Sequence, residues 1–130
     1  MSGPTWTYVS PLRGSPSLLP LARALLDALR LGEVDRPGLG EFVPRRPWAR
    51  SLGDVRVSLA VEVYGVDPYG GGPSSAEWMR VEAPPGRSLR ASISEIAWVG
   101  PELDVSAVGP PEWTDPIAAA VHAFVGRCAR

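Results

Sequence analysis

The chain has 130 residues, a net charge of −1, and 45% apolar against 21% charged residues. It contains no Lys, Asn or Gln and only one His and one Cys, beside thirteen Arg, fifteen Pro and fourteen Gly. This composition excludes a Schiff-base lysine, leaves too few ligands for a Cys/His metal site, and is poorly suited to nonspecific nucleic-acid or anionic-membrane binding. We therefore expect no metal and no cofactor.

Length and apolar content predict one globular domain that spans residues 1–130. The longest largely apolar stretch, residues 117–125, is too short to cross a bilayer, and the N-terminus has no signal-peptide pattern. We expect a cytoplasmic protein for these reasons. The missing residue types Lys and Asn have A-rich codons, so we favour a high-GC source over thermophily as their explanation.

The N-terminal part predicts a short edge strand at residues 6–9 and then an amphipathic helix. Ser17 is a suitable N-cap, Pro20 falls at the third helical position, and Gly32 supplies a stop. One face of this helix is apolar at helical spacing, through Leu18, Leu21, Ala22, Leu25, Leu26 and Leu29.

Residues 33–54 have no clear period and contain the basic-aromatic cluster Arg45, Arg46, Trp48 and Arg50. One interpretation is a single-strand nucleic-acid site, in which Arg binds phosphate and Trp stacks on a base. The other is a Pro-stiffened loop whose Trp fills the core while the arginines pair with nearby acids. Positive and negative charges cancel over the stretch, which favours the second interpretation.

Four segments alternate between apolar and polar residues and predict an antiparallel meander. They are residues 55–64, residues 78–83, a strand from Leu89 and a strand from Leu103. Pro85 and Gly86 fit the two central positions of a type II turn. The outward register predicts a solvated face with cross-strand charge pairs, or a polar docking surface; it carries Arg56, Glu62, Arg80, Glu82, Arg90, Ser92 and Asp104.

At Glu95 the alternation changes phase, and two explanations are open. If the register from Leu89 persists, the Glu95 carboxyl points into the core and could serve as a proton donor or acceptor. A β-bulge at Ser94 and Glu95 explains the phase change with one event and returns Glu95 to solvent. We favour the bulge.

The C-terminal segment predicts a helix with Asp115 as N-cap and Pro116 in its first position. Its core stripe consists of Ile117, Ala120, Val121, Phe124, Val125 and Cys128. Its back carries alanines, including Ala119, so the second side is open to a partner or another copy of the chain. We predict that Ala119→Arg disrupts association and leaves the monomer folded. His122, near the boundary of the stripe, is a weak candidate for a general base.

The chain has five tryptophans, more than its core needs, and Trp with Arg is the composition of binding hot spots. We therefore expect a partner to contact Trp48, Trp78, Trp113 and Ala119, together with Arg45 and Arg46.

The predicted fold is α+β: one antiparallel sheet of four to five strands in a meander, with an N-terminal and a C-terminal helix packed on one face. The favoured function is a non-enzymatic protein-interaction module, such as an assembly subunit, adaptor or immunity-type inhibitor that binds a protein partner or itself. The first alternative is a small-molecule binder or acid/base enzyme with Glu95 or His122 in a cavity between sheet and helices. The third is a single-stranded nucleic-acid binder.

Overall fold

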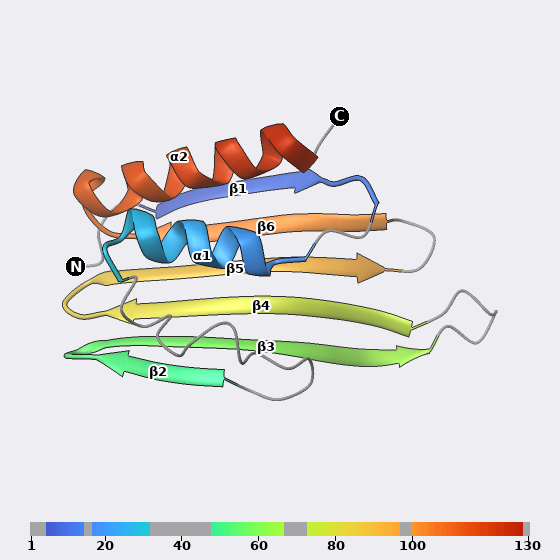
Figure 1. The fold of residues 1–130 in the computed structure, drawn as a ribbon, viewed down its shortest axis with the longest axis horizontal. Helices are drawn as coiled ribbons and strands as arrows, with labels where there is room; N and C mark the ends of the chain where they lie inside the picture. The colour runs from blue at the N-terminus through green and yellow to red at the C-terminus, as the bar shows by residue number, and fades with distance from the viewer. Residues whose placement is uncertain (1–4, 15–16, 32–47, 67–72, 97–99, 129–130) are drawn as a thin grey trace.

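The computed structural model describes residues 5–14, 17–31, 48–66, 73–96 and 100–128. They form one antiparallel sheet and two helices, and both helices lie on the same face of the sheet (Figure 1). The elements are β1 (Thr5–Pro11), α1 (Leu19–Ala28), β2 (Trp48–Leu52), β3 (Val55–Val66), β4 (Pro73–Ala83), β5 (Arg87–Ile96), β6 (Gly100–Val108) and α2 (Pro111–Cys128). The predicted α+β class is confirmed.

The described residues form six strands, more than the four to five expected, in the order β1-β6-β5-β4-β3-β2. The strand that the prediction missed is β2, within the stretch interpreted as an aperiodic connection. Leu52 pairs with Val55, so Gly53 and Asp54 form a two-residue hairpin loop, and Gly53 has the positive φ that such loops need. Strands β2 to β6 form a meander, and β1 joins its far edge by pairing with β6.

The alternation that predicted the strands also places the core. Inward residues of β3 to β6 are buried against the helices, as expected. The described and buried members of this register are Val57, Leu59, Met79, Val81, Ala83, Leu89, Ala91, Ile93, Leu103, Val105 and Ala107.

The predicted bulge at Ser94 and Glu95 is wrong. Strand β5 keeps one unbroken register with β4 from Arg87 to Glu95, and with β6 from Ser88 to Ile96. Glu95 therefore stays on the helix-facing side of the sheet, but it lies near the end of the strand and is exposed. A polar residue on the inward register needs no bulge where the core has already ended.

The turn between β4 and β5 is one residue longer than the predicted type II turn. Ala83 pairs with Arg87, so the connection consists of Pro84, Pro85 and Gly86, and Gly86 has a φ of +69°. This length keeps Val81 opposite Leu89, with both side chains on the apolar face. The apolar register of the two strands thus decides the turn length.

Helix α1 begins later and ends earlier than predicted. Leu18, not Ser17, is the N-cap residue; the Ser17 hydroxyl accepts a hydrogen bond from the Leu19 N–H at 3.2 Å. At the other end, Leu31 N–H donates to Leu26 O and Arg30 N–H to Asp27 O, which is the Schellman pattern. Arg30 holds the left-handed position of this motif with a φ of +60°. The predicted stop, Gly32, lies outside the described residues.

Helix α2 begins at Pro111, earlier than the predicted N-cap at Asp115, so Pro116 lies inside the helix. Pro116 is the sixth residue of the helix and lacks the N–H that would otherwise donate to the carbonyl of Glu112, so the helix forms without that hydrogen bond. The predicted core stripe is otherwise confirmed where the side chains are described: Ile117, Val121 and Phe124 are buried.

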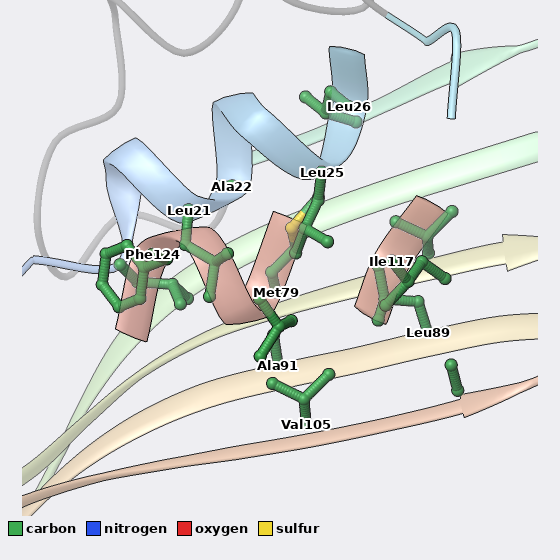
Figure 2. Packing of buried hydrophobic residues seen from close by; sticks show 14 of the residues in the cluster. Leu21, Ala22, Leu25, Leu26, Met79, Leu89, Ala91, Val105, Ile117 and Phe124 are labelled. Atoms are coloured by element: carbon green, nitrogen blue, oxygen red, sulfur yellow. The ribbon is translucent and has the colours of Figure 1, made fainter. Parts of the chain in front are cut away.

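Both helices and the sheet share one hydrophobic core. Figure 2 shows Leu21 and Leu25 of α1 together with Ile117 and Phe124 of α2, above Met79, Leu89, Ala91 and Val105 of the sheet. Burial of each such Leu, Ile, Val or Phe side chain contributes roughly 1.5–3 kcal/mol to folding. The core is therefore one-sided, and it fixes which face of the sheet remains open.

We predict that Arg30→Gly raises the free energy of unfolding by about 0.5–1 kcal/mol. Arg30 occupies a left-handed conformation that costs a residue with a Cβ atom more than it costs glycine. Chemical denaturation of the two proteins measures the difference. As the matched control, Ala24→Gly inside α1 should lower stability by about 1 kcal/mol; a loss at both positions would contradict the assignment.

We also predict that Gly109→Ala lowers the free energy of unfolding by about 1–3 kcal/mol. A Cβ atom at Gly109 would lie 2.7 Å from Cδ1 of Trp113 and 3.2 Å from Cγ of Arg87. The Trp113 ring has little freedom to move, because it is buried and its indole N–H donates to Ser88 O at 2.9 Å.

The control for this change is Gly126→Ala, at a position in α2 where a Cβ atom would meet nothing within 4 Å. There the substitution should raise stability by up to about 1 kcal/mol, because alanine favours helix. Thermal denaturation of both variants checks the pair, and equal effects at the two glycines would sink the packing explanation.

Candidate functional site

The open face is the side of the sheet opposite the helices. The part of the chain that the structure describes places no helix over it (Figure 1). Antiparallel sheets often leave one such face in water, and its side chains are then polar. Here the described outward side chains of β3 to β6 include Arg56, Ser58, Trp78, Arg80, Glu82, Ser88, Arg90, Ser92, Ser94, Glu102, Asp104 and Ser106.

A hollow of about 420 Å³ lies in the middle of the open face, over β4, β5 and β6. Its wall contains one aromatic, several hydroxyl and three charged side chains: Trp78, Arg80, Arg90, Ser92, Asp104 and Ser106. This volume is within the range of ligand-binding clefts. The hollow is therefore the candidate functional site.

Two arginines face one another in this hollow. Arg80 of β4 is the register partner of Arg90 of β5, and both side chains are exposed on the open face. Residues directly opposite in an antiparallel pair have Cβ atoms about 4.5–5.5 Å apart, and like charges at that spacing are unfavourable. The sheet thus concentrates two positive charges at its centre.

No carboxylate among the described residues forms a salt bridge with either arginine. Among the described residues, the ring of Trp78 is the contact of these guanidinium groups: Cζ of Arg80 lies 5.5 Å from the centroid of that ring. Such a cation–π contact keeps the side chain in place without neutralising its charge. Both guanidinium groups retain unused hydrogen-bond donors.

Asp104 is the one acid in the wall of the hollow. It is the register partner of Ser92, whereas Arg90 is the partner of Ser106, so acid and base sit diagonally and not opposite. The wall therefore carries two positive charges and one negative charge. A wall with this charge can attract an anion locally, whereas the net charge of the whole chain, −1, adds no long-range attraction for an anion.

The structure separates the residues that we expected to bind a partner. Trp78 lies half-buried in the hollow, Ala119 is exposed on α2, and Trp113 is buried in the core with 6% of its surface exposed. Cζ of Arg87 lies 5.6 Å from the centroid of the Trp113 ring, and the Trp113 indole N–H donates to Ser88 O. Trp113 therefore anchors α2 to the sheet. Arg45 and Arg46 lie outside the described residues, and Trp48 pairs through its backbone with Leu59 at the start of β2.

The two weak catalytic candidates do not line the hollow. Glu95 is exposed on the helix-facing side of β5. His122 is exposed on α2 and packs edge-on against Tyr8 and Trp6 of β1, with ring centroids 5.3 and 6.2 Å away. Its surroundings are thus aromatic. Within the described residues, no three His, Cys, Asp or Glu side chains are grouped so that they could hold a metal ion.

The juxtaposition of Arg80 and Arg90 is the feature that sequence reasoning missed. Both residues were predicted to face outward, but opposite charges were expected to pair across the strands. The signal was present: if Val81 and Leu89 must share the apolar face, a three-residue turn follows, and Arg80 then meets Arg90. The predicted two-residue turn concealed this register.

Comparison of the chain with protein-family models, with curated proteins and with solved structures gives no match. In the described part of the chain no helix is long and apolar enough to cross a membrane.

We predict that Arg80 and Arg90 destabilise one another in the free protein. A double-mutant cycle with Arg80→Met and Arg90→Met should give an unfavourable coupling of about 0.2–1 kcal/mol, largest at low ionic strength because salt screens exposed charges. The free energy of unfolding of the four proteins measures it.

The matched control is the cycle of Arg56 and Glu82, which are register partners on the same face with opposite charges. Its coupling should be favourable and of similar size. A coupling that is zero or favourable would mean that the two charges do not repel one another, and the site would lose its basis.

Proposed function

We propose that the protein is a non-enzymatic protein-interaction module that binds a protein partner on the open face. The observation that carries this proposal is the hollow at the centre of that face, in which Trp78 and two arginines meet. Trp and Arg are the side chains most enriched at binding hot spots, and hot spots lie near the centres of interfaces.

The position of the hollow supports docking of a partner. It spans three neighbouring strands, and on each of them the opposite register is buried in the core. The site is thus built on backbone that the core already fixes, so only its side chains need ordering when a partner binds. The hydroxyl groups of Ser92, Ser94 and Ser106 add donors and acceptors around the two arginines.

Charge favours a protein partner over a nucleic acid. Acids are interspersed with the arginines on the open face, with Glu82 beside Arg56, Glu102 beside Ser94, and Asp104 in the hollow. A phosphate backbone needs a continuous cationic track, which these carboxylates interrupt. A protein surface can match a mixed pattern residue by residue.

The enzyme alternative has lost the observation on which it depended. It required a cavity between sheet and helices into which Glu95 or His122 points. Glu95 is exposed, and the hollow lies on the other face of the sheet. His122 lies on α2, outside the hollow, with Tyr8 and Trp6 of β1 as its ring neighbours.

Photo-crosslinking in the source cells tests the docking surface. A photoreactive amino acid replaces Ser92 in the hollow in one variant and Ala119 on α2 in the other; Ala119 is the residue where a second interface was expected. We expect a discrete crosslinked protein from position 92 only, so this proposal departs from the interface that the sequence predicted at Ala119. When purified, that protein should bind the unmodified chain, and Trp78→Ala should weaken the binding at least about tenfold.

Two results would contradict the proposal. One is a crosslinked partner from position 119 and none from position 92, which would place the interface on α2. The other is undiminished binding of the purified partner to Trp78→Ala when circular dichroism shows that variant to be folded. Light scattering of the unmodified chain separates a partner from self-association, since a crosslinked second copy requires a dimer in solution.

A further inference from the structure

We infer that the hollow recognises a pair of carboxylates on an acidic segment of the partner, one carboxylate for each of Arg80 and Arg90. This inference rests on the proposed function, because it specifies which chemistry of a protein partner fills the same site. Its first support is the geometry of the two arginines, which are register partners at the centre of the sheet, on the face over which the described residues place no helix.

The second support is that the positive charges are not compensated within the described structure. An outward arginine directly opposite an acid can form an exposed ion pair. Here Asp104 shares the hollow but lies across a diagonal, and neither arginine forms a salt bridge with a described residue. An incoming anion would relieve the repulsion between the two guanidinium groups as well as accept their hydrogen bonds, so binding gains from both effects.

The third support is stoichiometry. A guanidinium group binds one carboxylate in a bidentate manner, so two neighbouring arginines match two carboxylates. The hydroxyls of Ser92, Ser94 and Ser106 can donate to the remaining carboxylate lone pairs. The ring of Trp78, held by Arg80, offers an apolar wall for the methylene groups of glutamate side chains.

The acids of the same face set the limits of the segment. Glu82 lies two residues after Arg80 on β4, and Glu102 lies two residues before Asp104 on β6, so both face the same side of the sheet as the hollow. They would repel the ends of a long polyanion, so a short acidic segment fits the hollow better than a long one. The acidic segment is therefore short.

Titration with the peptide hexaglutamate, followed by NMR, tests this inference on the full chain. We expect the arginine Nε–Hε signals of Arg80 and Arg90 and the backbone signals of β4 and β5 to shift. The dissociation constant should rise at least about fivefold in Arg90→Met, and increasing salt should weaken binding to the unmodified chain. Hexalysine should cause no shifts at these positions.

The matched control is Arg56→Met, which removes an arginine from the same face opposite Glu82. It should leave the dissociation constant for hexaglutamate within about twofold. Equal losses in Arg56→Met and Arg90→Met would show nonspecific attraction to positive charge and overturn the inference. Tighter binding of an oligothymidine than of hexaglutamate, lost in Arg90→Met, would overturn it in favour of a phosphate ligand.

Failure of this inference and failure of the proposed function give different results. If the crosslinked partner binds Arg90→Met as well as the unmodified chain but does not bind Trp78→Ala, the open face is the interface and the carboxylate assignment is wrong. If hexaglutamate binds as expected but the partner crosslinks from position 119, the anion site exists and the docking proposal is wrong.

Discussion

Four neighbouring strands have apolar side chains on the same face of the sheet, and these side chains must be shielded from water. The positions of both helices follow from this constraint. Strands β3 to β6 each present an apolar row to the same side. Two helices from opposite ends of the chain cover that side together, and the core continues from one helix to the other across the sheet. The Trp113 hydrogen bond to Ser88 ties the start of α2 to β5, one strand beyond the strand that it follows. Cover and sheet are thereby held as one unit.

Because stability comes from one face, the opposite face is free to carry side chains that do not favour folding. Arg80 and Arg90 show this freedom, since they occupy central strands where a neutral pair would cost nothing. Their repulsion is small beside the burial of even one leucine. A site that is slightly unfavourable in the free protein can be held in place by a core on the other side of the same strands. Local strain or repulsion of this kind is typical of binding sites.

The sequence predicted the class of fold, both helices and the inward register, because period-two and period-3.6 patterns depend on burial alone. It did not predict β2, because a pattern over the five residues from Trp48 to Leu52 is too short to be distinguished from that of a loop. The ends of α1 and α2 also differed, because Arg30 stands where a Schellman motif usually has glycine, and because α2 begins at Pro111, before the expected cap at Asp115. Trp78 and both arginines were placed outward from sequence. The pairing of Arg80 with Arg90 depends on the length of the turn between β4 and β5. The apolar register fixes this length at three residues, whereas Pro85 and Gly86 suggested a turn of two residues.

The pairing of β1 with β6 has a consequence for how the chain assembles. Thr5 lies opposite Val108, so β1, which is synthesised before the other described strands, pairs only with β6, the last of them. The meander from β2 to β6 can form by successive local hairpins. Strand β1 can pair only after β6 has been synthesised, and closing the loop between these two strands is entropically costly because it contains most of the chain. During synthesis the apolar side of α1 also emerges before the strands that it will cover. Among the described elements, β1 and the apolar side of α1 are therefore the ones that lack their packing partners longest during synthesis.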